Sequence, residues 1–137
     1  MSISLSNIKW GWVMLGVVIA FLIAYGVSVL TVTGYATYLA FQARGAPDQA
    51  LINEFAATYA EIVGSIFFGV GTLVGGLMAG RKAKKNAGNN GLAVGLITAI
   101  ICLVLDFLGS PNVWTVVGVV LSLGGGVWGG RIASRRS

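Results

Sequence analysis

Four acidic side chains are this sequence's only candidates for acid–base chemistry or cation binding. The 137 residues include no histidine and a single cysteine, Cys102, so they lack the ligand sets of zinc and haem sites. We therefore expect no cofactor, no metal site and no catalytic residue. Asp106 interrupts apolar sequence, where an ionisable group is costly and often functional, and Glu61 lies beside another apolar run. These two carboxylates could form a proton or cation site.

A plainer interpretation of the same carboxylates is that water or Arg44 compensates each one separately. Asp106 lies five residues before Pro111 and could cap a turn or pair with Arg44. Four hydroxyl groups inside the apolar runs can bond to their own helix backbones and need no pore to explain them. They belong to Ser65, Thr72, Thr98 and Ser122. We favour separately solvated or paired outer carboxylates over a cation site.

The composition is that of a membrane protein. Hydrophobic residues make up 56% of the chain and charged residues only 9%, against roughly 25% charged residues in soluble domains. Four runs between the charges are each long enough to cross a membrane as a helix, and they do not alternate as the strands of a barrel do. We predict one all-α, polytopic membrane domain over residues 1–137 with four transmembrane helices. The runs are Trp10 to Ala43, Ile62 to Gly80, Asn86 to Leu105, and Phe107 to Gly130.

The basic residues predict the orientation in the membrane. Eight of the nine lie on one side of the four runs, whereas Arg44 and all four acidic residues lie on the other. The positive-inside rule then predicts cytoplasmic N- and C-termini. The eight residues would determine topology or bind lipid headgroups, not nucleic acid. They are Lys9, Arg81, Lys82, Lys84, Lys85, Arg131, Arg135 and Arg136.

The first run is longer than a membrane requires. Its 34 residues would form a helix of about 51 Å, against a hydrocarbon core of about 30 Å. Gly34 offers a possible break, and Pro47 with Asp48 suits the start of another helix. An outer helical extension between the first two transmembrane helices is therefore expected. Its predicted apolar stripe is Leu51, Phe55, Thr58 and Ile62.

An internal repeat ends two of the runs in the same way. The stretch LVGGLMAGRKAKK begins at Leu73, and LGGGVWGGRIASRR begins fifty residues later at Leu123. Both stretches occupy the cytoplasmic end of an inward-running helix. This indicates two helical hairpins in the same orientation, a parallel repeat covering about residues 10–85 and about residues 90–136.

Glycines four residues apart give the repeat its physical purpose. Small residues at this spacing form a flat strip against which another helix backbone can pack closely. We expect these strips to pack the four helices together, with oligomerisation through one of them as the alternative. The predicted packing residues are Gly71, Gly75, Gly76, Gly80, Gly91, Gly95, Gly125, Gly126, Gly129 and Gly130.

The segments GGLMAGRKA and NNGLAVGLITAI, within residues 71–101, resemble a family of small prokaryotic four-helix membrane proteins of unknown function, the YrzE-like type. The resemblance implies a polytopic inner-membrane protein and carries no catalytic or binding residue with it. The long acidic loop over residues 44–61 departs from that pattern.

Insertion and helix contact account for almost every feature of the sequence. We therefore expect a non-enzymatic membrane protein, acting as an accessory or assembly subunit or by self-association. Its partners would be membrane lipids and other membrane subunits or further copies of itself. The alternative is a small transporter or channel that uses the outer carboxylates.

Overall fold

The computed structural model describes residues 8–83, 86–109 and 112–135, and the regular structure in these ranges is entirely helical. Four helical stretches are long and apolar enough to cross a membrane, which confirms the predicted all-α, multi-pass class. They are α1, the continuous stretch from α2 to α3, α4 and α5. The elements are α1 (Trp10–Ala43), α2 (Gln49–Phe55), the π-helix η2 (Ala56–Ala60), α3 (Glu61–Ala83), α4 (Ala87–Leu108) and α5 (Val113–Ser134).

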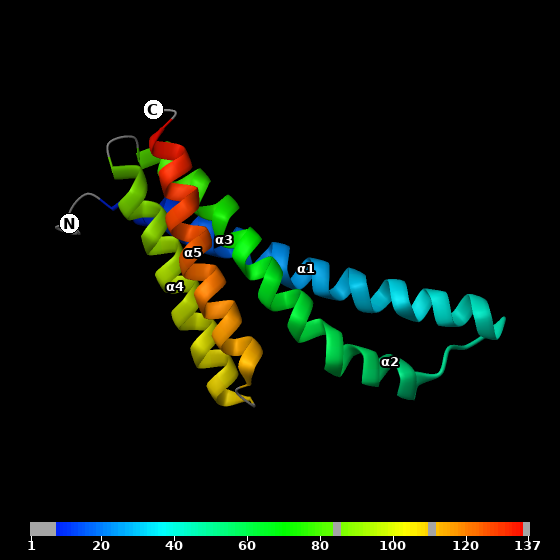
Figure 1. Ribbon diagram of the computed structural model, residues 1–137. Coiled ribbons are helices and arrows are strands. Elements are labelled where there is room, and N and C mark those ends of the chain that lie inside the picture. The colour runs from blue at the N-terminus through cyan, green and yellow to red at the C-terminus, as the bar shows by residue number, and fades with distance from the viewer. Residues whose placement is uncertain (1–7, 84–85, 110–111, 136–137) are drawn as a thin grey trace.

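Helix α3 is central to the bundle. It packs against α1, α4 and α5, while α4 also packs along α5. The start of α1, the end of α3 and the end of α5 lie together at one end of the molecule (Figure 1). Away from that end, the hairpin of α1 with α2 to α3 diverges from the hairpin of α4 with α5.

The α1–α3 contact brings two backbones together without side chains between them. A Cβ atom on Gly75 would overlap the backbone of Gly16, and a Cβ atom on Gly71 would lie 2.7 Å from the carbonyl oxygen of Ala20. Since these pairs follow one another at a spacing of four, they form the flat strip that allows membrane helices to approach closely.

Gly126 lies where three helices meet. A Cβ atom at this position would lie 2.6 Å from the carbonyl oxygen of Gly91 and 2.7 Å from Cα of Gly95, both on α4. On the α3 side, a Cβ atom on Gly76 would lie 2.9 Å from the carbonyl oxygen of Gly126. Each of the ten predicted packing glycines similarly faces atoms of another helix. Their positions are 71, 75, 76, 80, 91, 95, 125, 126, 129 and 130.

Glycines that align in the repeat make different contacts. Gly75 faces Gly16 on its hairpin partner α1, whereas its aligned counterpart Gly125 faces Gly69 on α3. On α5, the glycine that faces the hairpin partner is Gly126, one residue later. The repeated sequence therefore places glycine on both faces of α3 and α5, and a different face is used against the hairpin partner in each half.

A buried amide fixes the start of α1 against α4. The Asn90 side chain is fully buried; its Oδ1 accepts from the backbone N–H of Lys9 at 2.9 Å and its Nδ2 donates to the carbonyl of Asn86 at 2.9 Å. Nearby, the Lys82 ammonium lies 5.1 Å from the Trp12 ring centroid, a cation–π geometry that joins α1 to the end of α3.

The helix ends differ from the ends of the apolar runs in two places. Helix α1 continues unbroken through Gly34, so the possible break is not formed, because a single glycine inside a long helix costs only about 1 kcal/mol. The fourth run begins at Phe107, but α4 continues to Leu108 and α5 begins at Val113. The reason is a capping box: Asn112 Oδ1 accepts from the N–H groups of Trp114 and Thr115, and the Thr115 hydroxyl accepts from the Asn112 N–H.

Helix α2 begins where the sequence predicts a new helix, but the residues that it buries differ from the predicted apolar stripe. Asp48 is the N-cap of α2 and accepts from the N–H of Ala50 at 2.8 Å. Leu51 is exposed, and Ile52 is the buried residue of this helix. Phe55 stacks on Tyr35 of α1 with ring centroids 4.0 Å apart. The helix then widens into η2, which changes the register that simple α-helical spacing predicts.

The three-helix junction predicts opposite outcomes for two glycines of one run. Gly126→Ala should destabilise the protein by about 1–3 kcal/mol, because its Cβ would enter the backbone of α4. Gly124→Ala should leave stability unchanged or raise it by up to about 1 kcal/mol, because nothing lies within 4 Å of its added Cβ. Thermal unfolding in mild detergent measures both, and equal midpoints for the two variants would contradict the packing described.

Candidate functional site

A cavity of about 530 Å³ lies where the two hairpins diverge, and all four long helices contribute to its wall. Its surface is mostly apolar and includes Phe21, Phe68, Cys102 and Trp114. Phe21 and Phe68 meet edge to face with ring centroids 5.0 Å apart. These larger side chains follow the small residues of the α1–α3 strip, so the cavity begins where close backbone contact within the first hairpin gives way to side chains.

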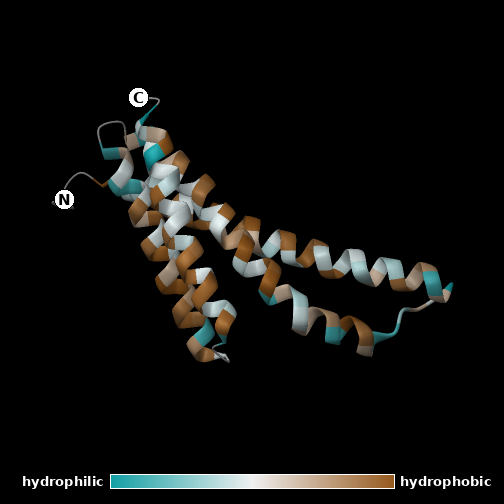
Figure 2. Ribbon diagram, viewed as in Figure 1, coloured by the Kyte–Doolittle hydropathy of each residue, from teal (hydrophilic) through white to brown (hydrophobic). Residues whose placement is uncertain are grey.

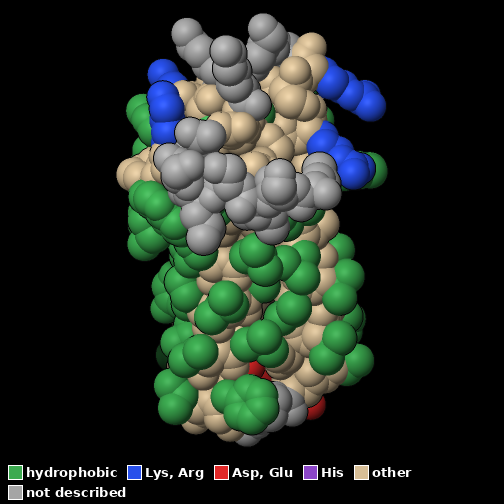
Figure 3. Space-filling view, turned by 90° about the vertical axis from the view of Figure 1, so that its left-hand side faces the viewer, with side chains coloured by type: hydrophobic (Ala, Val, Ile, Leu, Met, Phe, Trp, Pro, Cys, Tyr) green, Lys and Arg blue, Asp and Glu red, His purple; other side chains and the backbone are tan. Residues whose placement is uncertain are grey.

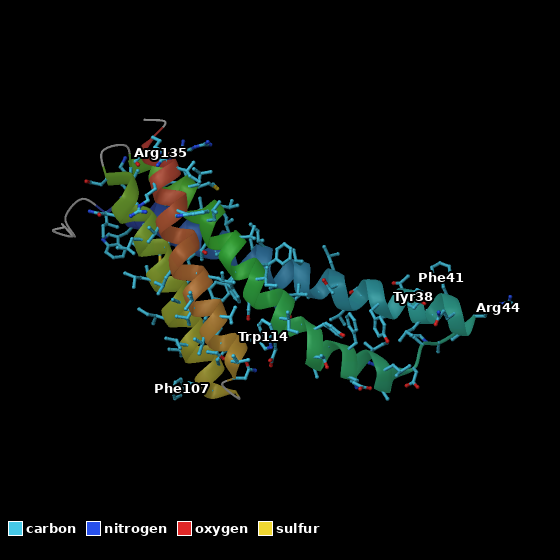
Figure 4. All side chains as sticks on the ribbon, in the orientation of Figure 1. Tyr38, Phe41, Arg44, Phe107, Trp114 and Arg135 are labelled. Atoms are coloured by element: carbon cyan, nitrogen blue, oxygen red, sulfur yellow. The ribbon has the colours of Figure 1, made fainter. Side chains whose placement is uncertain are left out.

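The structure brings Glu61 and Asp106 into the lining of this one cavity. Glu61 begins α3, and its Oε2 accepts from Asn112 Nδ2 at 2.6 Å. The Asp106 carboxylate, near the end of α4, forms no hydrogen bond or salt bridge with any described residue. Arg44 lies at the far tip of α1, a long way from Phe107, the residue that follows Asp106 in the sequence (Figure 4). The suggested Asp106–Arg44 pair is therefore not formed.

The local structure around Glu61 explains its position. The π-helix η2 ends at Ala60, and the extra residue of a π turn rotates the register of everything that follows. Two cross-helix hydrogen bonds then hold this part of α3: Ser28 Oγ donates to the carbonyl of Ala60 at 3.4 Å, and Ser65 Oγ donates to the carbonyl of Trp114 at 3.0 Å. Glu61 is thus positioned from both α1 and α5.

The hydroxyl groups of the spans behave differently from one another. Thr72 bonds to its own helix at the carbonyl of Phe68, at 2.8 Å, as expected. Ser65 bonds across to α5 instead. Thr98 and Ser122 are fully buried, and their hydroxyls have no partner among the described residues. The expectation of backbone bonding is wrong for these three.

The charges separate along the molecule. The Lys and Arg side chains gather at one end of the face in Figure 3 and acidic side chains appear at the other. The helix bodies between the ends are predominantly hydrophobic (Figure 2). Lys9 precedes α1, Arg81 and Lys82 end α3, and Arg131 and Arg135 end α5. Lys84, Lys85 and Arg136 lie outside the described residues.

Asn112 and Trp114 line the cavity but were not singled out as site residues from the sequence. A signal for Asn112 was present, because asparagine before an apolar run is a common N-cap. In the described ranges, no group of three or more His, Cys, Asp or Glu side chains could hold a metal ion. The arrangement offers an anionic, partly apolar space suited to binding.

Comparison with known protein families, curated proteins and solved structures finds no match to this chain. The resemblance to the YrzE-like type therefore stays a prediction.

The Glu61–Asn112 hydrogen bond predicts that substitutions at its two positions compensate each other in stability. Asn112→Asp keeps the N-cap acceptor but replaces the donor with a second carboxylate beside Glu61. It should lower stability by about 1–3 kcal/mol. Adding Glu61→Gln should restore most of this loss, because the new amide can donate to the new carboxylate. Unfolding midpoints of the two single variants and the double variant measure the coupling, and strictly additive effects would contradict it.

Proposed function

We propose that this chain is a non-enzymatic multi-pass membrane protein that acts by helix contact, as an accessory or assembly subunit of a larger membrane complex. The observation that carries the proposal is a projecting arm, defined as residues 29–60. Helix α1 has 34 residues and the α2 to α3 stretch 35, against 22 each for α4 and α5. The arm therefore extends beyond the hairpin of α4 and α5 (Figure 1).

The arm has the surface of a contact element. Leu30 and Phe41 of α1 are 71% and 79% exposed, and Tyr38 also lies open. Large exposed apolar side chains on a segment outside the main packing are typical of interaction sites. Asp48 and Glu54 add negative charge to the arm, and Arg44 is its single basic residue. We infer a partner subunit whose facing surface is apolar and basic.

We further propose an inner-membrane location with both termini in the cytoplasm and the arm on the outer side. Support comes from the positive-inside rule and from the basic residues at the start of α1 and the ends of α3 and α5, away from the arm (Figure 4). In this orientation the basic end contacts anionic lipid headgroups. The two hairpins then form the parallel repeat suggested by the recurring glycine and basic residues, with the arm as an outer extension of the first.

The orientation is tested by cysteine labelling. In a Cys102→Ala background, Gln49→Cys on the arm and Ser134→Cys at the end of α5 each introduce one exposed thiol. A membrane-impermeant maleimide added to intact spheroplasts should label the first and reach the second only after permeabilisation. Labelling of Ser134→Cys in sealed spheroplasts would overturn the proposed topology.

The contact function is tested with matched surface variants. Leu30→Ser with Phe41→Ser removes apolar surface from the arm, and Trp128→Ser removes a similarly exposed side chain, 65% accessible, from α5. Native mass spectrometry after mild detergent extraction should detect a heteromeric complex for the parent and for Trp128→Ser. The arm variant should lose it.

Other outcomes of this measurement count against the proposal. A complex that survives the arm variant would exclude the arm as the contact element. A parent that extracts only as copies of itself would overturn the accessory role and indicate self-association instead.

A small transporter or channel is the second candidate function. One observation favours it: Glu61 and Asp106 line the same cavity between the hairpins. A purified homo-oligomer that carries cation flux in liposomes would support this candidate over the first.

A further inference from the structure

The cavity between the hairpins has the dimensions of a small-molecule site. Its volume of about 530 Å³ falls within the range of about 300–1,000 Å³ that ligand pockets occupy. Its wall combines aromatic rings, including Phe21, Tyr25 and Trp114, with a small number of polar groups. Apolar walls with few polar groups orient a ligand that is itself largely apolar.

The charge of the cavity specifies the ligand further. Glu61 and Asp106 line it, and no lysine or arginine does so among the described residues. Glu61 is partnered by the neutral Asn112, and no described side chain bonds the Asp106 carboxylate. Asp106 is half-buried and Glu61 is exposed, so a cation that reaches the cavity can approach both carboxylates and compensate their charge. The described residues supply none here, because Arg44 is at the arm tip (Figure 4) and the other described basic residues lie at the start of α1 and at the ends of α3 and α5.

The way into the cavity suits an amphiphile. Helices α1 and α4 pack together near the basic end through Val13, Val17 and Val94. Their hairpins then diverge toward the other end (Figure 1). Tyr25, which lines the cavity, is 74% exposed. A molecule dissolved in the membrane could therefore enter sideways between α1 and α4, without crossing the bundle.

We propose that this cavity binds a monovalent organic cation with an apolar body. The cationic centre lies between Glu61 and Asp106, and the apolar body lies against Phe21, Phe68 and Cys102. Aromatic faces such as those of Tyr25 and Trp114 attract such cations in addition to the carboxylates. A bare divalent ion fits less well, because Ca²⁺ takes six to eight oxygen ligands and the described residues offer no cluster of three acidic, Cys or His groups.

This binding stands apart from the accessory function proposed above. It uses the cavity and not the exposed face of the arm, so either one can fail without the other.

The test uses tetraphenylphosphonium as the probe and tetraphenylborate as its control, because the two ions share a shape and differ in the sign of their charge. Equilibrium dialysis is performed on the full chain in phosphatidylcholine nanodiscs, with protein-free nanodiscs subtracted to remove partitioning into lipid. Saturable binding of one tetraphenylphosphonium per protein is expected, with tetraphenylborate bound at least roughly tenfold more weakly. Equal binding of the two ions, or no saturable binding, overturns the proposal.

Variants locate the site. Glu61→Gln with Asp106→Asn should weaken tetraphenylphosphonium binding at least roughly tenfold, whereas Glu54→Gln, which removes an arm carboxylate outside the cavity lining, should leave it unchanged. Unchanged affinity in the double variant overturns the proposal.

A second pair of variants keeps the test decisive if the double variant does not fold. Tyr25→Ala and Tyr38→Ala both truncate exposed tyrosines of α1, and Tyr25 alone lines the cavity. The first should weaken binding about threefold through the lost cation–π contact and the second should not. Equal effects of the two tyrosine variants overturn the assignment of the site.

Discussion

Direct backbone contact at glycine is the interaction on which the rest of this structure depends. Membrane helices gain nothing from exchanging lipid for leucine, so they associate through close packing. Here α3 meets α1 at Gly75 and Gly16, and α5 meets both α3 and α4 at Gly126. Because these contacts need no side chains, the helices approach closely at one end of the bundle. The other end, where Phe21 and Phe68 replace small residues, opens into the cavity.

One irregular segment joins the arm to the part of α3 that lines the cavity. Tyr35, Phe55 and Tyr59 stack in the arm, and η2 joins that stack to α3. A π turn changes the direction in which the following residues point, and such turns occur frequently at functional sites. In this chain the residue that follows is Glu61.

Basic and acidic residues lie at different ends of the helix bundle. Basic residues at the joined end of the bundle suit anionic headgroups, and the two cavity carboxylates lie toward the end where the hairpins diverge. The hydroxyls of Thr98 and Ser122 are buried without described partners, on the same two helices as Asp106 and Asn112. Polar groups are thus retained inside α4 and α5, where packing alone would favour apolar side chains.

The sequence by itself determined the class of the protein. Four long apolar runs specify four spanning helices, because a backbone in lipid must satisfy its hydrogen bonds internally. Local chemistry also specified Asp48 at the start of α2. The start of α5 at Val113 is also determined locally, since the Asn112 cap depends only on neighbouring residues.

Only the tertiary structure decided which residues meet. Gly124 and Gly126 belong to one glycine run, yet the first faces open space and the second touches two helices. The difference is a rotation about the helix axis, which the apolar pattern leaves free because lipid-facing and buried positions are equally hydrophobic. Glu61 and Asp106 lie 45 residues apart in the sequence. They line one cavity because α3 packs against α4 and α5, and no local pattern in the sequence specifies which helices pack together.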